Sequence, residues 1–259
     1  MNRARFELSK SLLQYVDVEE DGYAYSFRCE DPWEVLWATT LLQDEEGTIR
    51  WISSEVTAGD VFYDIGASTG IYSLFAGRRV GTEGVVYAFE PHIASARSLL
   101  HNVGHNGLTG QVKVMSCALT DGEEYLEFDY RSARPGAYVP EKEREAPPLF
   151  SELKHATSVD RLVESGAIQP ASLIKIDVDG AELQVLEGMG SLLREKTPRS
   201  VQVEVSPQSS EAVHEFMEDH GFTSVERNYS TFGLTRLARG DDPGSIVHNV
   251  IFRPREPSA

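Results

Sequence analysis

The chain has 259 residues, of which 41% are hydrophobic, and a formal net charge of −17 at pH 7. This length is enough for one large α/β domain with additions, or for two small domains. The negative charge argues against DNA or RNA as a partner, because a polyanion would be repelled unless a local basic patch intervened.

The basic residues are few and scattered. Lysine supplies only 6 of the 24, and the densest groups are Arg78 with Arg79 and Arg131 with Arg134. Neither group resembles a nucleic-acid-binding stripe interleaved with aromatic residues. Two explanations of the acidic, lysine-poor composition remain open: adaptation to a high-salt cytoplasm, or a G+C-rich genome, which also replaces lysine by arginine.

The cysteines and the apolar runs argue against a disulfide-rich, metal-binding or membrane-spanning protein. Cys29 and Cys117 predict neither a disulfide framework nor a metal-binding cluster. The first residues lack an apolar signal core, and no run approaches the ~18 apolar residues of a membrane span. We therefore expect a cytoplasmic protein with no membrane partner.

Residues 1–57 precede the first clear strand–turn–helix unit and are expected to form an N-terminal extension. Its predicted elements are a helix over residues 6–17, a strand over 23–29, and helices over 33–42 and 48–56. Asp31-Pro32 is typical of an N-cap followed by proline at the first helical position.

The stretch Val61-Phe-Tyr-Asp-Ile-Gly-Ala-Ser-Thr-Gly-Ile-Tyr-Ser73 predicts a strand, a tight glycine turn and a helix. Gly66 and Gly70 would let a bulky ligand lie close to the backbone, facing free amides at the helix start. The spacing Asp-x-Gly-x-x-x-Gly differs from the Gly-x-Gly-x-x-Gly that binds a pyrophosphate. The carboxylate of Asp64 suits a ligand with a cationic amine, such as S-adenosylmethionine (SAM). A tight turn without a ligand remains the alternative.

A second acid ends the next predicted strand, over residues 85–91. Glu90 falls 26 residues after Asp64, where a βαβ unit places an acid near a pair of ribose hydroxyls. A carboxylate can accept hydrogen bonds from both hydroxyls. The alternative is a surface acid at a strand end.

The remaining elements alternate between strands and helices. They are a helix over residues 94–106, strands over 112–119 and 124–130, a long loop or lid over 131–156, a helix over 157–164, a strand over 173–178, a helical stretch from 183, a strand over 200–205, a helix over 211–220, and strands over 223–229 and 247–252. Such alternation predicts a mostly parallel, doubly wound sheet. The last two strands, separated by an arginine- and glycine-containing loop, predict an antiparallel hairpin at one edge.

Four sequence blocks resemble the FkbM family of SAM-dependent methyltransferases. They are Tyr63-Asp-Ile-Gly-Ala-Ser-Thr-Gly-Ile-Tyr-Ser73, Ala88-Phe-Glu-Pro-His92, Ser158-Val-Asp-Arg-Leu162 and Ile174-Lys-Ile-Asp-Val-Asp-Gly-Ala-Glu-Leu-Gln-Val-Leu-Glu-Gly188. The fourth is the most specific, because its spacing is long. Together they cover about residues 58–206.

The resemblance implies a class I methyltransferase domain over residues 58–259, with a Rossmann-like, seven-stranded, mostly parallel sheet and an antiparallel last strand. It also implies SAM as the methyl donor and a hydroxyl on a small molecule, of sugar or natural-product type, as the acceptor. The implied cofactor-binding residues are Asp64, Gly66, Ala67, Ser68, Gly70, Glu90, Pro91, Cys117, Ala118 and Asp177. The chain departs from the family pattern at Ser68, where Asn is common, and at Asp179, where Glu is usual.

Methyl transfer to a hydroxyl requires aligned reactants and removal of the acceptor's proton. Asp177 and Glu204, which end predicted core strands, are the candidate catalytic residues, and we expect Asp177 to position the cofactor rather than act as the base. Weaker candidates for the base are Asp179, Glu182, His92 and His155. The run from Asp177 lacks the further ligands of a calcium loop, so no metal site is predicted.

Other functions remain open at this point. A nucleotide-cofactor oxidoreductase on a Rossmann-like sheet is one, although the spacing of the glycine turn argues against it. A non-catalytic SAM-binding protein is another. The sequence identifies neither the acceptor nor the oligomeric state.

Overall fold

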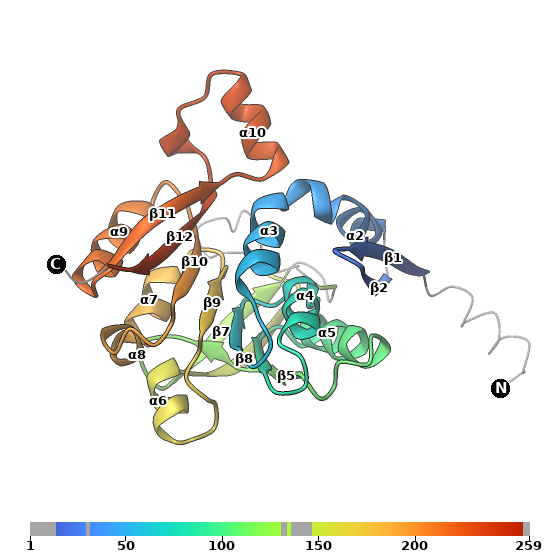
Figure 1. The fold of residues 1–259 in the computed structure, drawn as a ribbon, viewed down its shortest axis with the longest axis horizontal. Helices are drawn as coiled ribbons and strands as arrows, with labels where there is room; N and C mark the ends of the chain where they lie inside the picture. The colour runs from blue at the N-terminus through green and yellow to red at the C-terminus, as the bar shows by residue number, and fades with distance from the viewer. Residues whose placement is uncertain (1–13, 30–31, 131–133, 136–146, 256–259) are drawn as a thin grey trace, which may run out of the picture.

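The computed structural model describes residues 14–29, 32–130, 134–135 and 147–255 (Figure 1). A seven-stranded sheet forms its centre, in the order β11-β12-β10-β9-β3-β4-β5. The strands are β3 (Val61–Ile65), β4 (Val85–Phe89), β5 (Val112–Met115), β9 (Leu173–Ile176), β10 (Ser200–Val205), β11 (Phe222–Asn228) and β12 (His248–Pro254). β12 runs antiparallel to both of its neighbours, β10 and β11, and the other six strands run in one direction, so the predicted fold class is confirmed.

Helices cover both faces of this sheet. They are α3 (Glu46–Glu55), α4 (Ile71–Arg79) and α5 (Ile93–His105) on one face, and α7 (Glu182–Glu187), α8 (Gly190–Arg194) and α9 (Ser210–Asp219) on the other. Side chains alternate along each strand, so Phe62 packs with the first group and Tyr63 with the second. Among the described residues, no helix is both long and apolar enough to cross a bilayer.

The N-terminal segment forms a hairpin, β1 (Gln14–Glu20) and β2 (Tyr23–Cys29), followed by α2 (Pro32–Asp44) and α3. The strand over 23–29 and both later helices are confirmed. The helix expected over 6–17 is wrong from residue 14 onward, because β1 pairs along its full length with β2. Residues 6–13, the N-cap at Asp31 and the side chains of Trp33 and Trp37 lie outside the described part of the chain.

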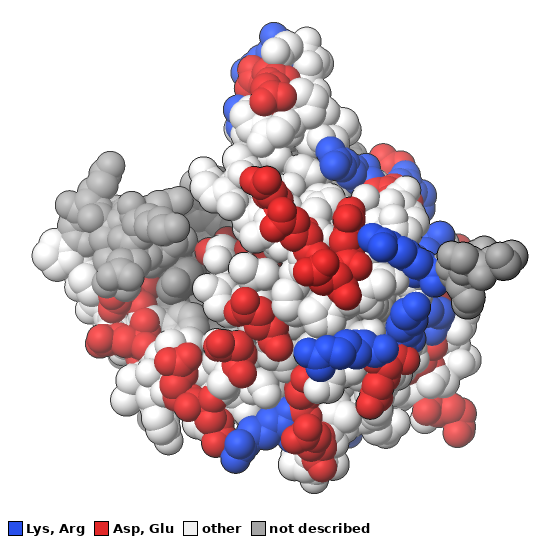
Figure 2. All heavy atoms as spheres, turned by 90° about the vertical axis from the view of Figure 1, so that its left-hand side faces the viewer, with Lys and Arg blue, Asp and Glu red and all other residues white. Residues whose placement is uncertain are grey.

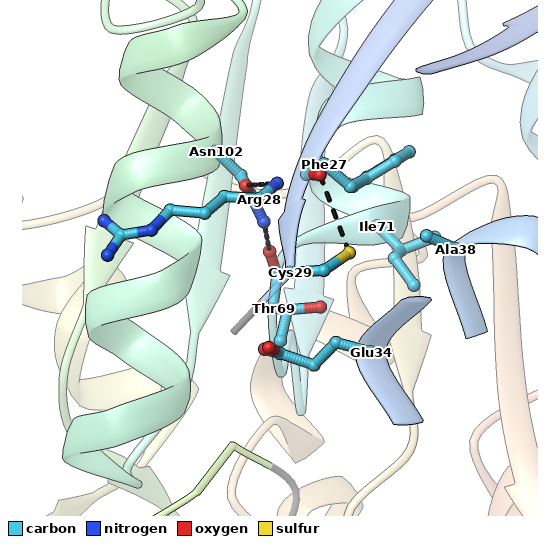
Figure 3. Close-up of a pocket in the computed structure, with 8 residues that line it drawn as sticks. All are labelled: Phe27, Arg28, Cys29, Glu34, Ala38, Thr69, Ile71 and Asn102. Carbon is cyan, nitrogen blue, oxygen red and sulfur yellow. Dashed lines mark hydrogen bonds between the residues drawn. The ribbon is translucent and has the colours of Figure 1, made fainter. Parts of the chain in front are cut away.

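Two asparagines, Asn102 of α5 and Asn106 directly after it, attach this hairpin to the domain. The Oδ1 atoms of Asn102 and Asn106 accept hydrogen bonds from the amides of Arg28 and Ser26, each at 2.9 Å. Asn102 also donates to the carbonyl of Thr69 at 2.9 Å, so it links β2 to the turn after β3 (Figure 3). The adjoining cavity is only about 10 Å³, which is room for one water at most.

A three-stranded sheet lies between β5 and β9 in sequence: β6 (Ala118–Leu119), β7 (Glu124–Tyr130) and β8 (Phe150–Thr157). The single strand expected over 112–119 is wrong, because the chain leaves the main sheet after Met115 and β6 pairs with β8 instead. The loop expected over 131–156 is also wrong from residue 150, where β8 pairs with β7. Residues 131–133 and 136–146 lie outside the described part.

Two short helices complete the description. α6 (Val159–Glu164) begins at an N-cap, Ser158, whose hydroxyl accepts from the amide of Arg161. Between β11 and β12 the expected loop is wrong, because α10 (Thr231–Ala238) forms there behind its own N-cap, Ser230. Phe232 and Leu234 of α10 are exposed, so these two side chains do not pack against the domain.

Candidate functional site

A cavity of about 710 Å³ lies at the carboxyl ends of β3, β4 and β9, and strand β7 forms another of its walls. Parallel α/β sheets bind ligands at this edge. The predicted site residues that line it are Gly66, Ser68, Glu90, Pro91, Cys117, Ala118 and Asp177. Asp64, Ala67, Gly70 and Glu204 do not line it. The tertiary structure thus gathers most of the predicted set in one cavity, while their roles toward a ligand stay predictions.

The glycine turn is shaped by its protein neighbours. Gly66 and Gly70 have φ angles of +81° and +92°, which favour glycine. A Cβ at Gly66 would lie 1.7 Å from the carbonyl oxygen of Asp177, and one at Gly70 would lie 2.2 Å from Leu99. A side chain at either position would therefore clash with protein atoms, while Gly66 also lines the cavity, so a role of this turn in ligand binding stays a prediction.

Glu90 is held by the backbone around it. One carboxylate oxygen accepts from the amide of Ser68 at 2.7 Å, and the other accepts from the amide of His92 at 2.8 Å. The residue is 7% exposed, and burial raises its pKa to about 7 against the lowering effect of these two bonds. The carboxyl group is thus fixed in place at the cavity wall, with lone pairs left for further donors.

An aromatic pair forms another part of the wall. The rings of His92 and Tyr130 stack with centroids 4.0 Å apart, and Nδ1 of His92 lies 3.0 Å from the hydroxyl of Ser95. Burial lowers the pKa of His92, so the imidazole is neutral at pH 7. Nearby, burial raises the pKa of the Cys117 thiol to about 11, which keeps it protonated.

Asp177 belongs both to the cavity and to a buried charge cluster. Its Oδ2 lies 3.0 Å from Nζ of Lys175, whose side chain is only 2% exposed. The same ammonium lies over the ring of Tyr72, 4.4 Å from its centroid. Lys175 therefore forms an ion pair with Asp177, and nearby negative charges raise the pKa of the lysine despite its burial.

Three more acids surround this ion pair. Asp64 is fully buried and accepts from the hydroxyl of Ser73 at 2.6 Å, and burial raises its pKa. Burial and the charge of Asp177 together raise the pKa of Glu204 to about 9. The same two causes raise the pKa of Glu45, the residue that precedes α3, to about 7. We call Lys175, Asp177, Asp64, Glu204 and Glu45 the Lys175 cluster.

The sequence analysis missed two members of this cluster. Lys175 had a signal, since it is a charged residue inside the apolar run Leu173-Ile-Lys-Ile176. Glu45 had none, because only the packing of the N-terminal segment brings it beside Asp177 and Lys175.

The weaker candidates for the base have other surroundings. Glu182 is 2% exposed and accepts from the amide of Gly180 at 2.8 Å, so it stabilises the start of α7. His155 is exposed on β8, near Glu123 and against the ring of Tyr125. Asp179 lines the cavity but is exposed, with a φ of +54°.

Comparisons with known proteins agree with this geometry. The model of the methyltransferase FkbM domain matches residues 64–224. Hexuronic acid methyltransferase AglP of Haloferax volcanii is 28% identical over 176 residues, which is 68% of this chain and 69% of that protein. Methyltransferase sdnD of Sordaria araneosa is 28% identical over 189 residues, which is 61% of this chain and 72% of that protein.

Two solved structures share the fold. A crystal structure of methyltransferase FkbM from Methylobacillus flagellatus KT gives a TM-score of 0.51 at 14% identity, over 74% of this chain and 43% of that one. This chain thus spans less than half the length of that structure. A putative rRNA methylase from Clostridium thermocellum gives a TM-score of 0.52 at 11% identity, over 83% of this chain and 98% of that one. At such identities the likeness concerns the fold alone.

Proposed function

The chain belongs to the FkbM methyltransferase family, and from this premise we propose that it transfers the methyl group of SAM to a hydroxyl group of a small molecule. Methyltransferase activity follows from the family. The observation that supports SAM as the donor is a single cavity with an amide-held acid, Glu90, and a second acid, Asp177, in its wall.

Each acid suits one part of the proposed donor. Glu90 can accept from two ribose hydroxyls while the amides of Ser68 and His92 hold it in place. Asp177 faces the cavity and carries a negative charge that favours the cationic end of the cofactor. Cys117, between β5 and β6, and Ala118, the first residue of β6, offer an apolar surface for the adenine.

Methyl transfer then needs little covalent help from the protein. When bound, SAM supplies an electrophilic methyl group on a positively charged sulfur. Asp177 is a poor base for the acceptor, because its carboxylate is already paired with Lys175 at 3.0 Å. We therefore assign Asp177 the role of positioning the cofactor, and look for the base elsewhere in the Lys175 cluster.

The acceptor class rests on the relatives. AglP is named for a hexuronic acid, which is a small hydroxylated molecule, and the net charge of −17 disfavours a nucleic acid. A hydroxylated small molecule, of sugar or natural-product type, is the acceptor that these two observations support best.

Calorimetry and product analysis test the proposal. We expect the protein to bind SAM and S-adenosylhomocysteine (SAH) but not NAD. With methyl-labelled SAM and a panel of sugars and sugar acids, we expect a product whose mass rises by one methyl group. Binding of NAD in place of SAM would favour an oxidoreductase, and SAM binding without turnover on any fraction of a cell extract would favour a non-catalytic binding protein.

A further inference from the structure

We propose that Glu204 takes the proton from the acceptor hydroxyl, and that the positive charge of the bound cofactor is what makes it able to do so. The inference rests on the proposed use of SAM. It adds that Glu204 releases a proton to solvent when SAM binds. It assigns the catalytic base and gives a role to the excess of acids around the single ammonium of the Lys175 cluster.

The position of Glu204 follows from strand register. Gln202 of β10 pairs with Lys175 of β9, so Glu204, two residues further along, projects from the same face of the sheet. Glu204 does not itself line the cavity, but the same register places it beside Asp177, which does. Among the residues that the structure describes, none donates a hydrogen bond to its carboxyl group.

The charges that face Glu204 come from several elements. β9 and the residues after it supply Lys175, Asp177 and Asp179, Glu45 lies just before α3, α4 supplies Tyr72, and β12 places the neutral Asn249 opposite. Asp64 of β3 lies near the same lysine. One ammonium cannot balance this many carboxylates in a partly buried site. The protein therefore retains protons there, consistent with a pKa of about 9 for Glu204.

The positive charge of a SAM molecule bound beside Asp177 would offset this excess of carboxylates and lower the pKa of Glu204. Glu204 then loses its proton to solvent, because the added positive charge stabilises the carboxylate form. The carboxylate next accepts the hydroxyl proton while the hydroxyl oxygen bonds to the methyl carbon, and the electron pair of the broken carbon–sulfur bond stays on sulfur. The sulfur is now neutral, so Glu204 keeps this proton until the next SAM binds.

Proton release on binding is measurable without turnover. SAM and SAH are titrated into the full chain at pH 8 in buffers of different ionisation enthalpy, a pH at which Glu45 is already mostly ionised. We expect SAM to release about one proton per site and SAH, which lacks the sulfonium charge, to release almost none. Glu204→Gln should abolish the release, weaken SAM binding about tenfold at pH 8 because the carboxylate formed on binding attracts the sulfonium, leave SAH binding unchanged, and lower kcat by roughly 10²–10⁴-fold.

The control variant is Glu226→Gln, an acid on β11 that pairs with Arg50 at the surface. It should release the same number of protons as the unaltered chain. Tight SAM binding with no proton release, or equal release from SAM and SAH, would overturn the inference and leave the proposed function standing. Undiminished release in Glu204→Gln would likewise exclude Glu204 as the group. Absence of SAM binding would instead overturn the proposed function itself.

Discussion

Glu90 is the residue whose loss tests the cavity most directly. Replacing it with alanine removes the acceptor for two ribose hydroxyls, which should cost about 1.5–3 kcal/mol, or roughly ten- to 150-fold in the affinity for SAM and SAH alike. Calorimetry measures this. Glu124→Ala, an exposed acid on β7 outside the cavity, should bind normally. Unchanged affinity in Glu90→Ala would remove Glu90 from the site.

Asp177 and Lys175 can be separated by a double variant. Asp177→Asn alone leaves the buried ammonium with a weaker partner, and we expect a loss of about 1–3 kcal/mol in unfolding free energy, since Asp177 is itself one-third exposed. Lys175→Met combined with Asp177→Asn should recover most of that stability. The SAM affinity should stay low in both variants, because the charge of Asp177 is absent from each.

Urea unfolding and calorimetry on the same samples separate stability from binding. If the double variant regained SAM affinity along with stability, Asp177 would have only a structural role. Wild-type affinity and turnover in Asp177→Asn would show that the strand β9 motif has been misinterpreted.

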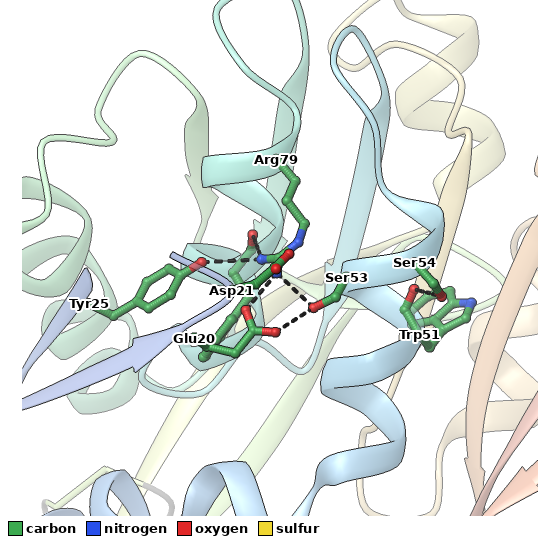
Figure 4. A network of polar contacts seen from close by, with 8 residues as sticks. Glu20, Asp21, Tyr25, Trp51, Ser53, Ser54 and Arg79 are labelled. Atoms are coloured by element: carbon green, nitrogen blue, oxygen red, sulfur yellow. Dashed lines mark hydrogen bonds and ion pairs between the residues drawn. The ribbon is translucent and has the colours of Figure 1, made fainter. Parts of the chain in front are cut away.

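At the scale of elements, Arg79 of α4 joins the β1–β2 hairpin and α3, both of which precede it in sequence. Its guanidinium, 5% exposed, pairs with Glu20 of β1 at 2.6 Å and donates to Ser53 of α3 at 2.7 Å and to Tyr25 of β2 at 3.2 Å (Figure 4). The N-terminal segment, which supplies Glu45 to the Lys175 cluster, is therefore attached to α4 by one side chain with several partners.

Removing this side chain should loosen the segment. Arg79→Met leaves Glu20 partly buried without its partner, and we expect a loss of about 3–5 kcal/mol. Arg50→Met removes an exposed ion pair with Glu226 and should cost less than about 1 kcal/mol. Urea midpoints compare the two. Equal losses would mean that the buried network adds nothing to the attachment.

For the whole molecule, the raised acids predict how stability depends on pH. The pKa values of Glu45 and Glu90 are about 7 and that of Glu204 is about 9, against 4.5 for an ordinary glutamate. The folded chain thus holds protons that the unfolded chain has released, and the free energy of unfolding should fall as the pH rises toward 9. His92 and His248, whose pKa values are lowered, act in the opposite direction, but only below about pH 6.5.

Thermal melts between about pH 7 and pH 9 therefore measure the effect of the three glutamates on stability without that of the histidines. We expect the melting temperature to fall over this window, and to fall less in Glu204→Gln, which has no proton to lose. A variant that lost stability as steeply as the unaltered chain would show that Glu204 is ionised throughout.

The net charge predicts the response to salt. On the face shown in Figure 2, Asp and Glu side chains are spread over the surface while most Lys and Arg side chains lie on the right, and the whole chain carries −17. Screening reduces repulsion among these acids. We expect the melting temperature to rise steadily with KCl up to molar concentrations. Insensitivity to KCl would leave the G+C-rich genome as the explanation for the scarcity of lysine.

The sequence by itself determined the features that depend on local residue order. The glycine turn after β3, the acid that ends β4 and the motif that ends β9 are each contained in a short stretch, so their element types and their common sheet edge could be predicted. Ser116 and Cys117 gave no sign that the strand begun at Val112 would end early. Pairing between β6 and β8 decides that, and pairing depends on residues far away in the chain.

Only the tertiary structure decided the electrostatics of the site. Lys175 could be seen in the sequence as a lysine in an apolar strand, but its partners come from β3, β10 and the N-terminal segment. The protonation of Glu204 depends on which charges pack around it and how far they are buried, because both effects act through space rather than along the chain. For the same reason the sequence located the two glycines but not their surroundings: Asp177 and Leu99 occupy the space where a Cβ at Gly66 or Gly70 would lie.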